Sequence, residues 1–325
     1  MIDVIIPNYN GAHLLPACLD ALRTQSRRDF VVTVVDDGSR DGSLALLAER
    51  YPEVRVLART QNQGLARAVN AGITATDAPY VVLLNNDTEA TPRWIDQLVG
   101  ALERRPQYAF AASKLLLFDR RDHIHSAGDY YQLSGEPGSR GVWDRDSGQY
   151  DVVSEVFGPC AGAAAYRRGA LEALAEGGKV FDEDLVMYCE DVDLNLRARR
   201  AGMRTIFVPT AVVYHKLSAT GGGTLASYYC GRNFALVWAK NMPGHLARHH
   251  WPALLRSQLR FALHSLRHLR EPAARARLRG QLAALRSMPR FLAKRQPPTN
   301  DRSADLLADA IVRWSPAGGQ PQSEI

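Results

Sequence analysis

Short apolar runs alternate with segments of helical spacing over residues 1–117. The run from Tyr80 to Leu84 lacks polar alternation, which predicts a strand buried on both faces, as in a mainly parallel sheet. The predicted strands are Ile2 to Ile6, Phe30 to Val35, Val54 to Leu57, Tyr80 to Leu84 and Ala109 to Leu117. The predicted helices between them are Ala12 to Thr24, Asp41 to Arg50, Gly64 to Thr74 and Thr91 to Glu103. This alternation predicts an α/β fold: a mainly parallel central sheet with right-handed crossovers, flanked by helices.

The pattern changes after the fifth run. Residues 119–150 are rich in Gly, Asp, Arg and Ser and poor in aliphatic residues, which predicts a long loop or flap. A helix is then predicted from Glu190 to Ala201. Two separate strand segments follow it, Thr205 to Val208 and Ala211 to Tyr214.

The last part of the chain combines helical amphipathicity with positive charge. Two amphipathic helices are predicted, one with an apolar face from Trp251 to Leu269 and one from Ala273 to Lys294. Residues 245–296 hold twelve Lys and Arg against one acid, whereas the whole chain has a net charge of only +6. Such helices suit an anionic membrane surface, and they equally suit a hairpin packed on the rest of the protein with a solvated arginine face. A loose tail with one short helix near Leu306 is expected after them.

Composition narrows the class of protein. A hydrophobic share of 46% and a charged share of 23% are ordinary for a soluble globular protein. The four cysteines form no C-x-x-C pair, which argues against a zinc site or a disulfide framework and suits a reducing compartment. No window reaches the roughly 18 to 20 apolar residues of a spanning helix, and the first residues show neither a basic leader nor a signal-peptide core, so we expect no membrane crossing.

Polar residues follow two of the predicted strands. Asn85-Asn86-Asp87 comes directly after the buried strand, and Asp36-Asp37 ends the second one. Parallel sheets bind ligands beyond the carboxyl ends of their strands, and a carboxylate with amide neighbours suits a hard divalent cation that also carries phosphate. Asp36-Asp37 can accept hydrogen bonds from a nucleobase or a ribose, although Asp-Gly-Ser-Arg-Asp-Gly is also ordinary turn chemistry. Residues 85–87 can likewise be read as a polar turn.

The first strand ends without a phosphate-binding glycine motif. It continues into Pro7-Asn8-Tyr9-Asn10-Gly11, and neither G-x-G-x-x-G after this strand nor G-x-x-x-x-G-K-[ST] is present. The dinucleotide-binding and P-loop classes are therefore disfavoured.

Three acids begin the predicted helix of the second half. Glu190, Asp191 and Asp193 suit the helix dipole, which alone can explain them. The dipole also keeps Asp191 ionised, which favours a general base that accepts a proton from a hydroxyl. His215 ends an apolar strand; such a histidine is more often structural, but it could join Asp87 in an octahedral metal site.

Taken in order, these pieces resemble the inverting glycosyltransferases of family 2, which have the GT-A fold. The resemblance spans about residues 2–240 and is carried by Val4 to Asn10, Val34 to Gly42, Asn62 to Asn70, Leu84 to Asp87, Gly162-Ala163, Phe181 to Glu183, Tyr188 to Leu194 and His215. It implies a 1–240 catalytic domain, with a nucleotide-sugar half (1–117) and an acceptor half (118–240), then a basic helical extension (241–296) and a flexible tail (297–325).

The resemblance also implies roles for individual residues. The nucleotide-sugar would be bound by Pro7, Asn8, Tyr9, Asp37, Arg67 and Asn86. A divalent metal, Mg²⁺ or Mn²⁺, would be bound by Asp87, with His215 and Asn85 as further ligands; Asn85 stands where many members have Asp, and an amide is a weaker, neutral ligand. Asp191, with Glu190 beside it, would provide the catalytic base.

The implied reaction transfers one sugar from a nucleoside-diphosphate sugar to an acceptor hydroxyl with inversion. The chain lacks the Q-x-x-R-W motif of processive synthases. The subgroup looks like bacterial rhamnosyltransferase-like and galactofuranosyltransferase-like members that build surface polysaccharides, which implies a dTDP or UDP donor, with rhamnose a candidate, and a glycan or lipid-linked acceptor. The implied location is the cytoplasm, with the inner face of the cytoplasmic membrane as the place of contact.

Three alternative functions fit parts of this sequence. A nucleotidylyltransferase would need a glycine-rich loop with a cation after the first strand, which Pro7 to Gly11 does not provide. A nucleic-acid-binding protein could use the basic segment, but that segment has few aromatics and no known module, so no nucleic-acid partner is expected. The third alternative is an inactive transferase-like scaffold.

Overall fold

The computed structural model describes residues 1–152, 155–217, 223–296 and 301–314. Within these residues the chain forms two compact units. The first unit contains residues 1–129, the described part of 139–186, and 203–217; the second contains 130–138, 187–202 and the described residues from 223 onward.

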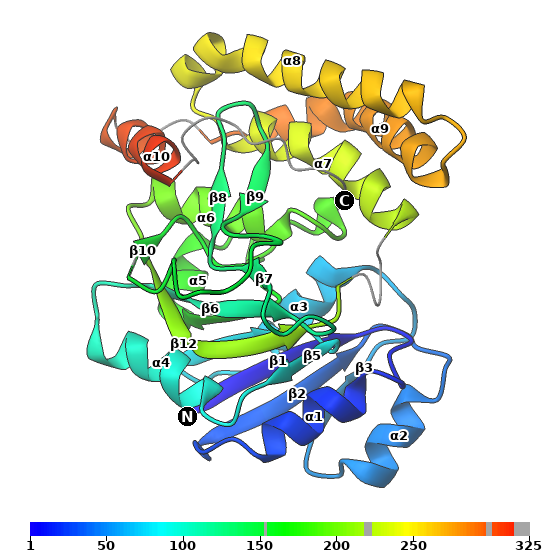
Figure 1. Ribbon diagram of the computed structural model, residues 1–325, viewed down its shortest axis with the longest axis vertical. Helices are drawn as coiled ribbons and strands as arrows, with labels where there is room; N and C mark the ends of the chain where they lie inside the picture. Colours follow the sequence, from blue (N-terminus) through cyan, green and yellow to red (C-terminus); the bar gives the residue numbers. More distant parts are fainter. Residues whose placement is uncertain (153–154, 218–222, 297–300, 315–325) are drawn as a thin grey trace. The chain divides into compact units, whose positions relative to one another are not determined.

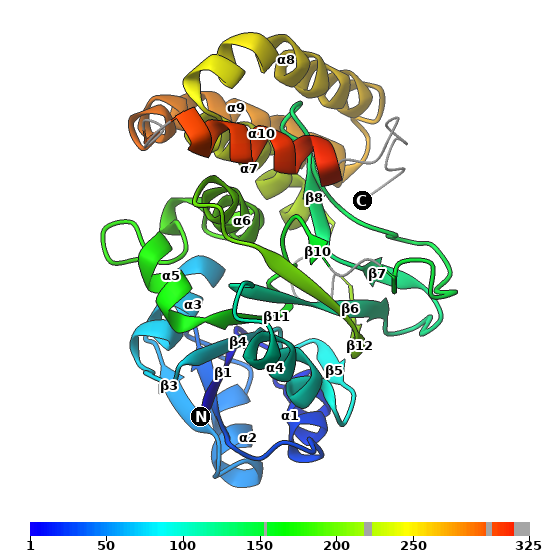
Figure 2. The same ribbon diagram turned by 90° about the vertical axis from the view of Figure 1, so that its left-hand side faces the viewer.

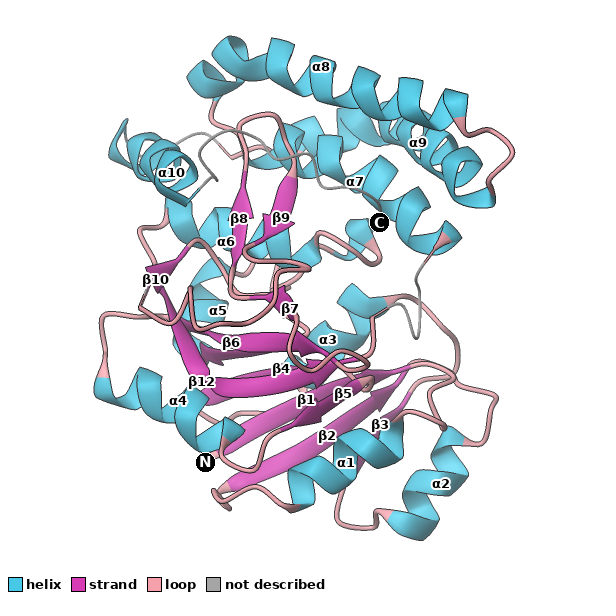
Figure 3. Ribbon diagram, in the orientation of Figure 1, coloured by secondary structure: helices cyan, strands magenta, loops and turns pink. Residues whose placement is uncertain are grey.

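A central mixed sheet organises the first unit (Figures 1 and 3). Its strands run in the order β10-β12-β6-β11-β4-β1-β2-β3, with β5 on β12 and β7 on β6. The strand bounds are β1 Ile2–Asn8, β2 Phe30–Asp36, β3 Arg55–Ala58, β4 Tyr80–Leu84, β5 Thr88–Ala90, β6 Phe110–Leu117, β7 Ile124–Ser126, β10 Glu155–Val156, β11 Ala163–Arg167 and β12 Thr205–His215. The pairs β1–β2, β1–β4, β2–β3 and β6–β12 are parallel, whereas β11 runs antiparallel to β4 and β6. The predicted α/β fold with a mainly parallel sheet is therefore confirmed.

Helices cover both faces of this sheet. The helix bounds are α1 Leu15–Arg23, α2 Ser43–Arg50, α3 Leu65–Thr74, α4 Trp94–Arg104 and α5 Arg168–Leu174, with a short 3₁₀ turn η1 at Glu183–Leu185. On one face, α1 and α4 bury Leu19 and Trp94 with Val4 of β1. On the other face, α3 approaches so closely that a Cβ at Gly72 would lie 2.5 Å from Ile5 Cγ2. Both faces of the central strands are therefore buried, as the unbroken apolar run of β4 predicts.

The two segments predicted as separate strands around Pro209 are not separate. They form a single strand, β12, whose register with β6 shifts between Val208 and Val212. Pro209 falls within this irregularity. Proline has no N–H to donate to a ladder, and a bulge is where a strand tolerates that loss.

The predicted loop at 119–150 contains short strands and a buried anchor. Besides β7, the strands β8 (Asp129–Tyr131) and β9 (Pro137–Ser139) pair with each other. Lys114 of β6 is almost fully buried, and its Nζ lies 2.9 Å from Asp146 Oδ2 and 2.6 Å from Asp151 Oδ1. Sequence periodicity does not predict this ordered structure, because the ion pairs that hold the loop join residues far apart in the sequence.

Helices dominate the second unit. Their bounds are α6 Glu190–Arg200, α7 Thr224–Asn241, α8 Gly244–Arg267, α9 Pro272–Ala293 and α10 Asp301–Trp314. Helix α7 packs so closely along α9 that a Cβ at Gly280 would lie 2.1 Å from the carbonyl oxygen of Tyr228. Glycine is needed there because it has no Cβ.

The predicted C-terminal helices are confirmed as α8 and α9, and the helix near Leu306 as the longer α10. The other residues of the predicted tail, 297–300 and 315–325, lie outside the described part of the chain. Within the described part, no helix has both the length and the apolar character needed to span a bilayer. The proposed boundaries at 117, 240 and 296 remain predictions.

Candidate active site

The carboxyl ends of β1, β2 and β4 are joined by a chain of side-chain hydrogen bonds. Asn86 Nδ2 donates to Asn8 Oδ1 at 2.7 Å, and Asn8 Nδ2 donates to Asp36 Oδ2 at 2.8 Å. A Cβ at Gly11 would lie 2.3 Å from both amides, so this backbone must approach them as glycine. Asn8 and Asn86, both predicted to bind the donor, thus also hold three strand ends in place.

Asp37 supports the neighbouring loop. Its Oδ2 accepts hydrogen bonds from the backbone N–H groups of Gln63 and Gly64 at 2.8 and 2.9 Å. Its Oδ1 lies 3.1 Å from Arg59 Nη1. One carboxylate oxygen is therefore committed to the start of α3, and the other is held beside a cation.

The other residues predicted to bind the nucleotide are more accessible. Tyr9 is exposed, Pro7 is half-buried, and Arg67 lies in the first turn of α3. Arg67 Nε lies 3.4 Å from Glu183 Oε2. Asn70, which the sequence reasoning did not assign, links α3 to the same segment by exchanging hydrogen bonds with the backbone of Phe181 at 2.8 and 2.9 Å.

Asp87 and His215 come together although they are far apart in sequence. Strand β12 pairs with β5 so that His215 stands opposite Thr88, and the backbone N–H of Lys216 donates to the carbonyl oxygen of Asp87 at 2.9 Å. His215 Nε2 lies 3.1 Å from Asp87 Oδ1. Both side chains are at most 10% exposed.

This pair fits a divalent metal. Two ligands about 2.1 Å from an octahedral ion are about 3.0 Å apart, which matches the separation of these two atoms. Asp87 Oδ1 is buried and receives no well-aligned hydrogen bond, so its lone pairs are available. Asn85 is tied by its backbone N–H to Gly162 O at 2.8 Å.

His125 is a residue of this site that the sequence reasoning missed. Its Nδ1 lies 3.0 Å from Nδ1 of His215. Burial, and secondarily His215, hold the pKa of His125 well below its usual range, so its ring is neutral and one ring nitrogen can accept a hydrogen bond. His215 can then donate from Nδ1, which leaves the lone pair of Nε2 available to a metal ion shared with Asp87. No sequence pattern indicates this contact; it arises from the pairing of β7 with β6.

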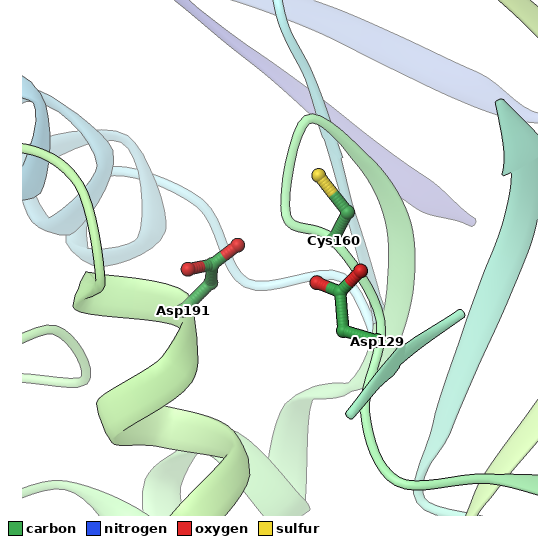
Figure 4. Close-up of side chains that lie close together, drawn as sticks. All are labelled: Asp129, Cys160 and Asp191. Carbon is green, nitrogen blue, oxygen red and sulfur yellow. The ribbon is translucent and has the colours of Figure 1, made fainter. Parts of the chain in front are cut away.

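Asp129 and Cys160 of the first unit, shown in Figure 4, were not predicted to be site residues. Asp129 Oδ1 accepts hydrogen bonds from Ser126 Oγ at 2.9 Å and from Ser139 Oγ at 2.8 Å. These bonds hold both ends of the loop that carries β8 and β9.

In the second unit, a strained turn leads into α6. Tyr188 and Cys189 have φ angles of 61° and 68°, in the left-handed region that disfavours such side chains. Asn233 Nδ2 supports this turn by donating to the carbonyl oxygens of Met187 and Tyr188 at 3.0 and 2.8 Å. Backbone strain of this kind often accompanies a functional position. Asp191 follows, at the start of α6 (Figure 4).

The three acids at this helix start have different environments. Asp191 is partly exposed, and its Oδ1 accepts the backbone N–H of Val192 at 2.8 Å. Asp193 is fully buried and accepts hydrogen bonds from Lys240 Nζ, Arg197 Nε and Asn241 Nδ2 at 3.0, 2.9 and 2.7 Å. Burial raises the pKa of Asp193, but these partners outweigh it and the pKa falls to about 2. Asp193 is thus a structural ion-pair residue, whereas Asp191 is accessible.

Glu190 is the third acid. Burial and the charge of Asp191 raise its pKa to about 8, so it is mostly protonated at neutral pH. The helix dipole alone would predict the opposite, and desolvation dominates here.

Replacing Glu190 with glutamine is expected to change the pH dependence of stability. A carboxyl group whose pKa rises from 4.5 to about 8 on folding stabilises the protein fully below pH 4.5, and this contribution is lost as the pH rises to about 8. Glu190→Gln should therefore be more stable than the wild type at pH 8.5, and its free energy of unfolding should change less with pH between 4.5 and about 8. Urea unfolding across this pH range measures it; parallel curves for the two proteins would contradict the assignment.

Comparisons with known proteins identify relatives of this chain. The family model described as "Glycosyl transferase family 2" matches residues 3–175. An N-acetylglucosaminyl-diphospho-decaprenol L-rhamnosyltransferase of Mycobacterium tuberculosis is 28% identical over 303 residues, which cover 83% of this chain and 92% of the relative. The amylovoran biosynthesis glycosyltransferase AmsB of Erwinia amylovora is 27% identical over 257 residues, covering 76% and 79%.

Solved structures share the fold. The mannosyltransferase PcManGT from Pyrobaculum calidifontis, in complex with GDP-Man and Mn²⁺, aligns with a TM-score of 0.54 and 20% identity over 96% of this chain and 86% of that one. GalNAc-T7 with UDP, GalNAc and Mn²⁺ aligns with a TM-score of 0.60 and 16% identity over 74% of this chain, which spans only 48% of GalNAc-T7. These neighbours are GT-A glycosyltransferases, so the predicted GT-A fold is confirmed.

The nucleic-acid-binding and inactive-scaffold alternatives are not favoured. The family match covers more than half of the chain, and it includes Asn8, Asp37 and Asp87. The chain belongs to glycosyl transferase family 2.

Proposed function

We propose that this glycosyltransferase moves a single sugar, with inversion, from a nucleoside-diphosphate sugar to a glycan or lipid-linked acceptor in the synthesis of bacterial surface polysaccharide. The observation that carries the proposal is the pair of Asp87 Oδ1 and His215 Nε2, 3.1 Å apart after the carboxyl end of β4. The names of the mycobacterial and Erwinia relatives support the acceptor class and make dTDP-rhamnose the first donor to test.

A divalent metal, Mg²⁺ or Mn²⁺, would be held by Asp87 and His215, with Asn85 as a neutral neighbour. When bound, such an ion offsets the negative charge that develops on the leaving diphosphate. His125 would keep His215 in the tautomer whose Nε2 can act as a ligand.

The donor nucleotide would contact the residues at the ends of β1 and β2. Asp37 would accept from the base or ribose through Oδ1, since Oδ2 is engaged by backbone N–H groups. Pro7, Asn8, Tyr9 and Asn86 would provide backbone and amide contacts. Arg67 would add positive charge close to the nucleotide.

Asp191 would act on the acceptor. Its carboxylate takes the proton of an acceptor hydroxyl while that oxygen attacks the anomeric carbon from the face opposite the diphosphate. The bond from the anomeric carbon to the diphosphate oxygen breaks in the same step, which inverts that centre. Glu190, protonated beside it, limits negative charge at the helix start and keeps the base role with Asp191.

The reaction would take place in the cytoplasm.

Donor and metal dependence are tested together by thermal unfolding. The protein is melted with dTDP-, UDP- and GDP-sugars, each with and without Mn²⁺ or Mg²⁺. A donor at about 100 times its Kd adds roughly 2.7 kcal/mol of stability, which shifts Tm visibly. We expect a metal-dependent shift with one nucleotide class, dTDP-rhamnose first. The absence of a shift with every donor would overturn the proposal.

Replacing Asp87 with asparagine is expected to abolish the metal-dependent part of donor binding. The variant keeps the side-chain shape but removes the charged metal ligand. Titration calorimetry with dTDP, with Mn²⁺ or with a chelator, should give nearly equal affinities for Asp87→Asn and clearly different ones for the wild type. Asp96→Asn, on the surface of α4, is the matched control and should behave as the wild type. A preserved metal effect in Asp87→Asn would remove Asp87 from the metal site.

A further inference from the structure

Helix α8 has an unusual distribution of apolar side chains. Six large apolar residues lie on one side of α8 and the turn after it, and each is between 46% and 54% exposed: Trp251, Leu255, Leu259, Leu263, Leu266 and Leu269. At 3.6 residues per turn they form one stripe about 120° wide. We call these six residues the α8 apolar strip.

The packed side of α8 is a different one. Its buried residues are small: Ala247, Ser257 and Ser265. Contacts to the rest of the second unit come from the same side, where Phe261 lies under Arg277 of α9 at 3.9 Å. In two perpendicular views α8 lies on the outer side of α9 (Figures 1 and 2). The α8 apolar strip is therefore not what holds this helix in the fold.

An amphipathic helix normally buries its leucines and exposes its small polar residues. The reversed arrangement of α8 indicates a partner for the strip. An exposed apolar surface rimmed by polar residues is typical of a protein or membrane interaction site.

The charge around the strip selects the partner. Arg256 and Arg267 are exposed and flank it on the helix surface. The segment 245–296 carries a net charge of +11, with Glu271 as its only acid. A second copy of this chain would place that charge against itself, whereas a bilayer with anionic headgroups is complementary to it.

We propose that α8 binds the surface of an anionic bilayer, with the α8 apolar strip inserted between headgroups and the flanking arginines paired with lipid phosphates. A helix of this kind lies in the plane of the interface and does not cross it. The inference goes beyond the proposed transfer reaction and does not depend on its donor or acceptor.

The test is co-sedimentation of the full chain with vesicles. The wild type should bind vesicles made of equal parts phosphatidylglycerol and phosphatidylcholine, and bind vesicles of phosphatidylcholine alone much more weakly. Leu259→Ser/Leu263→Ser should lower the partition coefficient about tenfold or more, because two inserted side chains lose their apolar contact. Arg256→Gln/Arg267→Gln should lower it by a similar factor and weaken its salt dependence.

The matched control is Leu44→Ser/Val56→Ser, which alters two apolar residues of the first unit that are 40% and 39% exposed. It should bind as the wild type. Donor-induced thermal shifts should be the same in all variants, which separates membrane binding from donor binding and shows that each variant is folded.

Two results would overturn the proposal. One is unchanged vesicle binding of Leu259→Ser/Leu263→Ser. The other is a dimer in sedimentation equilibrium that this substitution dissociates, with no vesicle binding by the wild type, which would assign the strip to a second copy of the chain.

Discussion

Replacing Asp191 with asparagine is expected to lower the rate of sugar transfer 10²- to 10⁴-fold while donor binding is retained. General-base catalysis contributes a factor of this size, and an amide cannot accept the proton of the acceptor hydroxyl. The side chain is partly exposed and lies in the first turn of α6, so the substitution should leave the helix intact. Product formation with saturating donor measures the rate, and the thermal shift with donor and Mn²⁺ measures binding.

An anionic nucleophile separates a lost base from a lost structure. Azide needs no deprotonation, so Asp191→Asn should form glycosyl azide from the donor at a rate close to that of the wild type. Asp309→Asn, on the exposed side of α10, is the control for the charge change within the same unit. Near-normal sugar transfer by Asp191→Asn, or equal loss of both reactions, would remove the base role from this residue.

Replacing Asp193 with alanine is expected to destabilise the protein by about 3–5 kcal/mol, because Lys240 and Arg197 would keep their buried charges without a partner. Urea unfolding at neutral pH measures this change. The double variant Asp193→Leu/Lys240→Met should be less destabilised than the sum of the two single changes, because it removes both partners of one pair. A single-variant loss below about 1 kcal/mol would contradict the buried network.

The same network predicts the response to acid. The pKa of Asp193 falls from 3.8 to about 2 on folding, so its contribution is present above pH 3.8 and is lost as the pH falls toward 2. The wild type should lose stability over this range more steeply than Asp193→Leu/Lys240→Met.

Local patterns in the sequence were sufficient for most helices and strands of residues 1–117, although the short strand β5 was not predicted. The predicted strand from Tyr80 to Leu84 is β4 to the residue, and the other predicted strands and helices of residues 1–117 differ by a few residues at their ends. The polar residues after the strands were also readable, since β1 ends at Asn8, and Asp37 and Asp87 follow β2 and β4. A strand that is buried on both faces is apolar at almost every position, so its own short segment of sequence is enough to identify it.

The roles of individual polar residues required the tertiary structure. The sequence places Glu190, Asp191 and Asp193 in one helical turn and cannot distinguish them. Burial protonates Glu190, and Lys240 and Asn241 of α7 engage Asp193, which leaves Asp191 accessible. A pKa depends on solvation and on charges from other elements, and neither is encoded in local spacing.

His215 and the α8 apolar strip show the same limit. A histidine at the end of a strand is ambiguous until β5 brings Asp87 and β7 brings His125 against it. The α8 pattern fitted a packed hairpin and a membrane helix equally well, and it is the burial of Ser257 and Ser265 that shows which side faces the protein. The sequence by itself determined most helices and strands of residues 1–117, the helix that begins at Glu190 and the two C-terminal helices, together with the polar residues that follow the strands, because periodicity is a local property. Only the tertiary structure decided which surfaces meet, because that depends on contacts between segments far apart in the chain.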